Sequence, residues 1–166
     1  MPPGNEPDLY DRLRRRVLWA MPTGLYVVGS TAGDGASGDA QGDAQGDAKR
    51  DAGQGRWNLM TANLVVQVAT EPKLVAVAVE TGAVTRRFVD ASDCFAVSLL
   101  GRESRAVVRR FVKPVRDVEL DGEGRVERLA GEPVVLAPSG APVLRVAVAW
   151  LDCHVRHRVE LGSHIL

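Results

Sequence analysis

Short apolar runs separated by polar and glycine-containing segments dominate this chain, and this pattern predicts a strand-rich protein. Between residues 73 and 79, Val75, Val77 and Val79 alternate with alanines, which is the period of a β-strand. Similar runs predict further strands, and polar residues at 121–124 predict a hairpin turn. The predicted strands cover residues 25–30, 64–68, 73–79, 95–100 and 143–155, with a continuation to Glu160 left open.

Helical spacing occurs at three places along the chain. Leu9, Leu13 and Val17 recur every four residues and predict a helix over 7–20. Shorter helices are expected over 84–91 and 103–112. Because strands and helices do not alternate regularly, a parallel sheet is not expected. The pattern favours a mainly β protein with flanking helices, arranged as a β-barrel or an α+β fold.

One segment, residues 31–56, departs from this pattern. It repeats Gly-Asp-Ala-Gln and contains no aliphatic residue larger than alanine. A polar repeat of this kind has nothing to bury, so we expect a disordered, low-complexity insert within a single domain spanning 1–166. The sequence Gly-x-Gly-x-x-Gly at 33–38 lies inside this repeat. Since no apolar helix follows it, we do not interpret it as a dinucleotide-binding fingerprint.

The composition of the chain bears on its cellular location and on the classes of partner that it can bind. The 166 residues include 25 valines and one isoleucine, and β-branched residues suit strands. Positive and negative charges balance at 21 each, so neither nucleic acid nor an anionic membrane is an expected partner. Arg14–Arg16 followed by an apolar stretch imitates a signal peptide, but Pro22-Thr23-Gly24 interrupts it. Two cysteines without a Cys-x-x-Cys pattern suggest reduced thiols and a cytoplasmic location.

Candidate chemistry is sparse. His154 and His157 would point to opposite faces of a strand, so a metal site is not expected. Neither cysteine has the surroundings of a catalytic nucleophile, and Gly-x-Ser-x-Gly does not occur. The segment Met60-Thr61-Ala62-Asn63 lies between two predicted strands. Its short side chains and backbone amides suit an anionic or heteroaromatic ligand, although a plain turn explains them equally well.

Six short motifs occur in the order seen in the flavin reductase-like proteins, whose fold is the FMN-binding split barrel, and the chain resembles that family over nearly its whole length outside the insert. They are Pro22-Thr23-Gly24-Leu25, Leu59-Met60-Thr61-Ala62-Asn63, Glu71-Pro72-Lys73-Leu74-Val75, Phe95-Ala96-Val97-Ser98-Leu99-Leu100, Pro142-Val143-Leu144 with Ala149-Trp150-Leu151-Asp152-Cys153, and Gly162-Ser163-His164.

The resemblance implies a split β-barrel homodimer that binds FMN or FAD near the subunit interface. It places Met60, Thr61, Ala62 and Asn63 at the polar edge of the flavin ring, with Val79 beside the ring. It also implies that Thr85 and Arg86 contact the phosphate, where the guanidinium fork suits phosphate oxygens. Phe111 would cover the ring, and His164 would face the flavin or the nicotinamide.

The implied function is an NAD(P)H-dependent flavin reductase that transfers hydride from NADH or NADPH to flavin N5, with a flavin-dependent monooxygenase as a possible partner. The alternative is a non-catalytic module that carries or senses flavin. Three departures from the family pattern bear on this choice. Ala83 stands where relatives have serine, Ser163 replaces an aspartate, and the chain stops at Leu166, before the family's Ile-Phe-x-Gly-x-Val strand. We therefore expect a barrel lacking its C-terminal strand.

Overall fold

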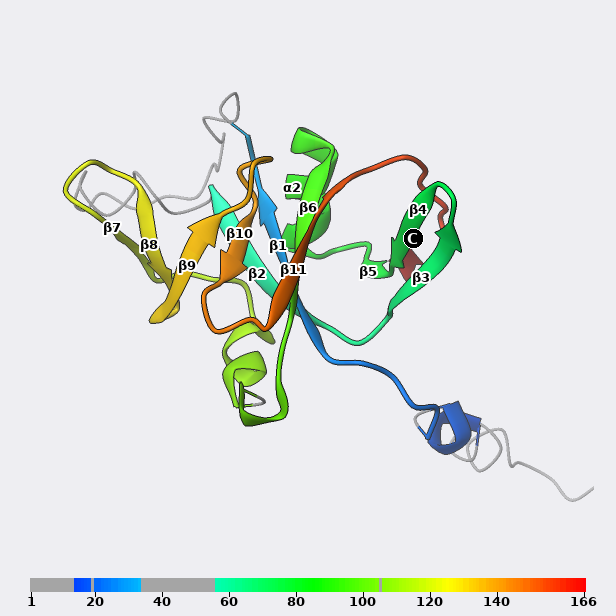
Figure 1. Cartoon of the computed structure of the whole chain (residues 1–166). Coiled ribbons are helices and arrows are strands. Elements are labelled where there is room, and N and C mark those ends of the chain that lie inside the picture. The colour runs from blue at the N-terminus through cyan, green and yellow to red at the C-terminus, as the bar shows by residue number, and fades with distance from the viewer. Residues whose placement is uncertain (1–13, 19, 34–55, 105) are drawn as a thin grey trace, which may run out of the picture.

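β-Strands dominate the computed structural model, which describes residues 14–18, 20–33, 56–104 and 106–166 (Figure 1). The central sheet is antiparallel and has the order β11-β6-β1-β2. These strands are β1 (Tyr26–Thr31), β2 (Trp57–Ala62), β6 (Cys94–Leu99) and β11 (Ala149–His154). In this order β2 and β11 form the two edges of the sheet, and β1 is paired on both sides.

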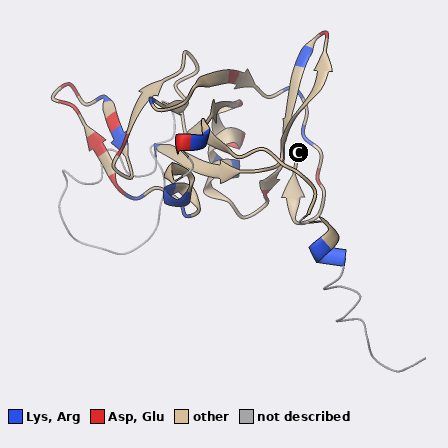
Figure 2. Cartoon of the chain, turned by 60° about the horizontal axis from the view of Figure 1, so that its bottom comes forward, with Lys and Arg blue, Asp and Glu red and all other residues tan. Residues whose placement is uncertain are grey.

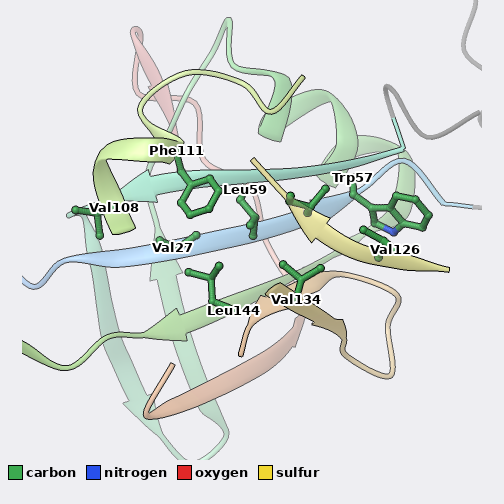
Figure 3. Close-up of a cluster of buried hydrophobic side chains, with 9 residues drawn as sticks. Val27, Trp57, Leu59, Val108, Phe111, Val126, Val134 and Leu144 are labelled. Carbon is green, nitrogen blue, oxygen red and sulfur yellow. The ribbon is translucent and has the colours of Figure 1, made fainter. Parts of the chain in front are cut away.

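A second antiparallel sheet with the order β10-β9-β8-β7 packs against the first. Its strands are β7 (Val118–Leu120), β8 (Val126–Leu129), β9 (Glu132–Leu136) and β10 (Pro142–Leu144). The main apolar cluster lies between the sheets and includes Val27, Leu59, Phe111, Val134 and Leu144 (Figure 3). Burial of these large side chains is the principal stabilisation that joins the two layers.

The remaining strands form two pairs beside the central sheet. The hairpin of β3 (Val65–Thr70) and β4 (Lys73–Val77) lies at the opposite end of the molecule from β7 and β8 (Figure 1). The short β5 (Val79–Glu80) pairs with β12 (His164–Ile165). These pairs border a second apolar cluster that contains Val28, Ala62, Val77, Val79, Val97 and Ile165.

The helix α2 (Val84–Ser92) covers β1 and β2. Asp93 follows it in the left-handed conformation, with its N–H donated to the Val89 carbonyl, which ends the helix. The predicted helix over 84–91 is therefore confirmed to within one residue.

The predicted strand over 143–155 is wrong, because it is two strands in two different sheets. β10 ends at Leu144 and β11 begins at Ala149, with a turn between them in which the Ala147 N–H bonds to the Leu144 carbonyl. A continuous apolar run does not reveal where the chain passes from one layer to the next. Sequence reasoning also missed β9 and β12.

The helix predicted over 103–112 is also wrong in type. This segment contains two short 3₁₀ helices, η1 (Arg102–Ser104) and η2 (Val107–Phe111). Adjacent β-branched residues at 107–108 disfavour a regular α-helix, and 3₁₀ turns are common in such short connections. The change matters because η2 packs against β2 next to the predicted flavin segment.

The ends of the predicted insert belong to the sheet. Thr31 is the last residue of β1, and the Ala32 N–H donates to the Arg56 carbonyl at 2.9 Å. Residues 34–55 lie outside the described part of the chain, as does much of the helix predicted over 7–20. Residues 14–18 of that helix are described and are helical, with Val17 and Leu18 exposed.

Acidic and basic residues are interleaved on the β7–β8 hairpin (Figure 2). Arg125 lies 2.8 Å from Asp121 and 2.9 Å from Glu123. The hydrogen bond from the Arg125 side chain holds the pKa of Asp121 below its ordinary value. This surface therefore combines both signs of charge, in contrast to the one-sided basic patch typical of nucleic-acid binding.

Candidate functional site

The segment predicted to hold the flavin ring lies at the end of an edge strand. Met60, Thr61 and Ala62 are the last residues of β2, and Asn63 follows them and is exposed. Because side chains alternate along a strand, they face two sides. Met60 and Ala62 join the second apolar cluster, whereas the Thr61 hydroxyl donates to the Val108 carbonyl on the η2 side. The segment Met60–Asn63 is therefore the end of β2 and the residue after it, and the prediction that it lies between two strands is wrong.

The backbone of this strand end has groups that do not pair with another described strand. β2 pairs with β1 along one edge only. The bond from Ala32 N–H to the Arg56 carbonyl sets the alternation of the antiparallel ladder. In an antiparallel pair every second residue bonds to the neighbouring strand, so counting from Arg56 makes Met60 and Ala62 the residues that bond to β1. The N–H and C=O of Thr61 therefore point away from β1. The backbone, more than the side chain, of Thr61 can therefore contact a heteroaromatic edge.

The residues predicted to contact the phosphate lie in the first turn of α2. The Thr85 side chain is 1% exposed, and its Oγ1 accepts a hydrogen bond from Asn58 Nδ2 at 2.9 Å. Arg86 is half-buried, with Nε 3.3 Å from Asp90 and Nη2 2.9 Å from Glu160. The two side chains thus have protein partners, and of the two only the Arg86 group also reaches a cavity.

His164 lies in β12 and is held through its neighbour. Ser163 Oγ is 2.9 Å from His164 Nδ1, and the Ser163 carbonyl accepts the Thr81 N–H at 3.0 Å. The serine at the position of the family's aspartate therefore still orients the ring. Since His164 is directly opposite Glu80 in the β5–β12 pair, it is brought next to the strand that contains Val79.

A cavity of about 440 Å³ lies among β4, α2, β11 and the segment 155–159. Val79 and Arg86 are the predicted site residues that line it. Its apolar lining includes Val28 and Phe95, and its charged residues are Lys73, Arg86, Arg156 and Arg158 against Asp90 and Asp152. An apolar wall combined with an excess of positive charge suits a flat ring that has an anionic tail.

The cavity contains one thiol, Cys153. Burial, followed by the neighbouring Asp152 carboxylate, raises the pKa of this thiol above its ordinary value. A thiol with a raised pKa is a poor nucleophile at neutral pH, so the geometry gives no support to thiolate chemistry here.

Phe111 lies far from the position expected of it. It is 1% exposed and packs in the cluster between the two sheets with Leu59 and Leu144 (Figure 3). Its ring therefore presents no surface to a flavin in this structure. The structure brings Met60, Ala62 and Val79 together in one cluster, places His164 beside them, and puts Phe111 and the Thr61 hydroxyl on the other side of the sheet.

Sequence reasoning missed the polar residues that surround the predicted site. Asn58 is a buried amide in β2, and Asp90, Glu160 and Arg158 form ion pairs around Arg86, with Arg158 Nε 3.2 Å from Asp90. Asn58 lies in β2, which was not among the predicted strands, so its burial could not be expected. The Arg86–Glu160 pair, 74 residues apart, had no signal in the sequence either.

Comparison with known proteins decides the family. Residues 18–166 match the flavin reductase like domain. The chain belongs to this family. This match covers every described strand, and the predicted resemblance is therefore confirmed.

Two relatives and one solved structure illustrate the similarity. The chain is 31% identical to the NADH-dependent FAD reductase of Streptomyces globisporus, over 99% of this chain and 76% of that protein. It is 27% identical to the stachydrine N-demethylase reductase subunit Stc3 of Rhizobium meliloti, over 96% of this chain and 56% of that protein. The solved NADH:FAD oxidoreductase SgcE6 of Streptomyces globisporus, in complex with NAD and FAD fragments, has a TM-score of 0.64 at 28% identity, covering 98% of this chain and 80% of that one.

These comparisons confirm the mainly β fold as the split barrel of the flavin reductases. The chain spans about half to three quarters of the length of these two relatives. Among the described residues, no helix has the length and apolar character needed to cross a bilayer. The same residues contain no group of three or more histidine, cysteine or acidic side chains arranged to hold a metal ion.

Proposed function

We propose that this chain is an NAD(P)H-dependent flavin reductase. The observation that carries the proposal is the family match over 18–166, together with a cavity whose lining contains Val79 and Arg86. Bound flavin would supply the redox chemistry by accepting a hydride from the nicotinamide of NADH or NADPH at N5. The residues present fit such a ligand, because the cavity has an apolar wall for a ring and an excess of positive charge for a phosphate.

The roles proposed for individual residues follow from their positions. The outward backbone groups of Thr61 and the exposed Asn63 are placed to bind the polar edge of the ring, with Met60, Ala62 and Val79 on its apolar side. Arg86 is the phosphate contact, assisted by the first turn of α2 that contains Thr85. His164, oriented by Ser163, faces the reacting rings. Hydride transfer needs donor and acceptor to be stacked at short distance and needs no strong acid or base, which agrees with the sparse chemistry of the sequence.

The fate of the reduced flavin is also a proposal. The relative from Rhizobium meliloti is by name the reductase subunit of a demethylase. By analogy, this chain would supply reduced FMN or FAD to a partner monooxygenase.

Titration with FMN and FAD followed by an NADH and NADPH oxidation assay tests the function. We expect quenching of flavin fluorescence on binding and flavin-dependent loss of absorbance at 340 nm. Replacement of His164 by glutamine should lower the turnover with little change in flavin affinity. Flavin binding without nucleotide oxidation would favour the carrier or sensor module, and absence of flavin binding would contradict both functions.

A homodimer is the proposed assembly, and the β3 region supplies the surface. Leu64, Val66 and Val68 are 48%, 58% and 59% exposed, which is unusual for three large aliphatic residues so close together. Val66 and Val68 lie in β3 of the projecting β3–β4 hairpin, and Leu64 directly precedes this strand (Figure 1). A concentration of exposed aliphatic side chains marks an interaction surface, and a second copy of this chain is the occupant proposed here.

Replacing Val66 by aspartate is expected to convert the dimer to a monomer, because it places a charge in the apolar interface. Val66 does not line the cavity, so the substitution leaves the flavin contacts within one subunit in place. Sedimentation velocity measures the change. Val112, 73% exposed on the segment after η2, provides the control: Val112→Asp should leave the sedimentation coefficient unchanged. A wild-type protein that sediments as a monomer would contradict the proposal.

The proposed cytoplasmic location is supported by the two cysteines, both of which are free thiols. In the β6–β11 pair, Cys94 is opposite His154 and Cys153 is opposite Phe95. The two thiols therefore point to opposite faces of the sheet, which does not permit a disulfide between them.

A further inference from the structure

Asn58 is a buried amide whose bonds join three separate parts of the fold. It is 3% exposed and is the second residue of β2. Its Nδ2 donates to Thr85 Oγ1 at 2.9 Å, and its Oδ1 accepts the Val115 N–H at 3.0 Å. One side chain thereby fixes the first turn of α2 and the segment after η2 to the same strand.

The chemistry of this position suits a neutral amide. The Asn58 side chain donates in one direction and accepts in the other without a charge, which an aliphatic group of similar size cannot do. Ser30 is directly opposite Asn58 on β1. Among the described residues, its Oγ is the buried side-chain nitrogen or oxygen atom that has no hydrogen-bond partner. A buried polar group in an apolar sheet costs free energy unless it is satisfied, so the two bonds of Asn58 are needed to keep it there.

The proposed ring contacts follow Asn58 by two to five residues: Met60–Ala62 end the same strand, and Asn63 comes directly after it. The residue that follows its partner Thr85 is Arg86, the proposed phosphate contact. The Asn58–Thr85 bond is therefore the direct polar link between the two parts of the proposed flavin site. It sets the distance between the strand end and the first turn of the helix.

We propose that Asn58 is a positioning residue for flavin phosphate, acting through Thr85 to hold the first turn of α2, and with it Arg86, in register with the end of β2. This inference rests on the proposed function. It assigns Thr85 a different role from that predicted by the family resemblance. Its hydroxyl is the partner of Asn58, and the phosphate is contacted by Arg86.

The selectivity for FMN over riboflavin tests the proposal, because the two ligands share the ring and differ in the phosphate. Dissociation constants for both are measured by fluorescence titration with the full chain. Asn58→Ala and Thr85→Val should each lower the ratio of the riboflavin to the FMN dissociation constant about tenfold, with the riboflavin constant itself nearly unchanged. Thr85→Ser, which retains the acceptor, should restore the ratio. The double variant should lose no more than either single variant, because both remove the same bond.

A matched control is available on the same sheet. Ser98 is fully buried, and its Oγ accepts the Leu144 N–H at 3.1 Å, away from α2. Ser98→Ala should lower the midpoint of urea unfolding without changing the FMN-to-riboflavin ratio. If Asn58→Ala does not fold, Asn58→Ser provides the same comparison.

The outcomes separate this inference from the function on which it rests. Equal weakening of FMN and riboflavin by Asn58→Ala would show a purely structural role and overturn the inference. Loss of selectivity in Thr85→Val alone, with Asn58→Ala unchanged, would mean that Thr85 contacts the phosphate itself and would also overturn it. A wild-type protein that binds neither flavin would instead contradict the proposed function.

Discussion

Replacing Gly29 by alanine is expected to lower the free energy of unfolding by about 3 kcal/mol. Gly29 lies in β1, where β10 crosses the central sheet, and a Cβ at this position would be 1.8 Å from the Pro142 carbonyl oxygen. A clash with backbone cannot be relieved by rotating a side chain. β1 would have to move, and it is bonded to β2 and β6 on its two sides. Equilibrium unfolding in urea measures the loss.

Gly122→Ala is the control for this prediction. A Cβ at Gly122 would have no neighbour within 4 Å, and the residue is not in the left-handed conformation. We expect its free energy of unfolding to stay within about 0.5 kcal/mol of wild type. If Gly29→Ala were equally harmless, the close approach of β10 to β1 described here would be incorrect.

Replacing Arg86 by alanine is expected to raise the dissociation constant for FMN by about 10- to 100-fold and to leave that for riboflavin nearly unchanged. Hydrogen bonds to a charged group contribute roughly 1.5–3 kcal/mol, which corresponds to that range. Arg86 lines the cavity and also forms an ion pair with Glu160, whose carboxylate lies 2.9 Å from its guanidinium group. Glu160→Gln should therefore act in the opposite direction, strengthening FMN binding several-fold because it removes a carboxylate that competes with the phosphate. Fluorescence titration with both flavins measures these effects.

The adjacent Arg87 separates this role from general electrostatic attraction. Arg87 is exposed on the same helix and does not line the cavity. Its replacement by alanine removes the same charge and should change the FMN constant less than twofold at physiological salt. An equal loss in both variants would indicate a diffuse field around α2 and would contradict a specific contact by Arg86.

Local patterns predicted the strands whose two faces differ, because alternation is visible in a single segment. The helix over 84–91 is confirmed to within one residue, whereas the strand predicted over 73–79 is divided into β4 and the short β5, which pair with different strands. The passage from β10 to β11 could not be predicted in this way. Residues 143–155 remain largely apolar as the chain leaves one sheet and joins another, and only the packing of the two layers determines where the break falls.

The candidate site shows the same limit at the level of side chains. The motif around Met60–Asn63 was predicted to lie between two strands, and sequence alone could not reveal that it ends β2 with Thr61 and Ala62 facing different apolar clusters. Phe111 has an aromatic side chain suited to cover a flavin ring, but it is buried between the two sheets. The partners of Arg86 and Thr85 come from Glu160 and Asn58, which are distant in sequence, so their pairing depends on the tertiary fold.

The bond between Ala32 and Arg56 has a consequence for how this gene product can vary. It closes the β1–β2 hairpin at 2.9 Å before the segment 34–55 begins, so the sheet register does not depend on that segment's length. The entropy of closing a loop rises only logarithmically, by about 0.6 kcal/mol for each doubling of its length. Four-residue units such as Gly-Asp-Ala-Gln could thus be gained or lost here by unequal recombination at little cost in stability. We therefore expect the repeat number to have little effect on the free energy of unfolding, and natural variants to differ there before they differ in the barrel.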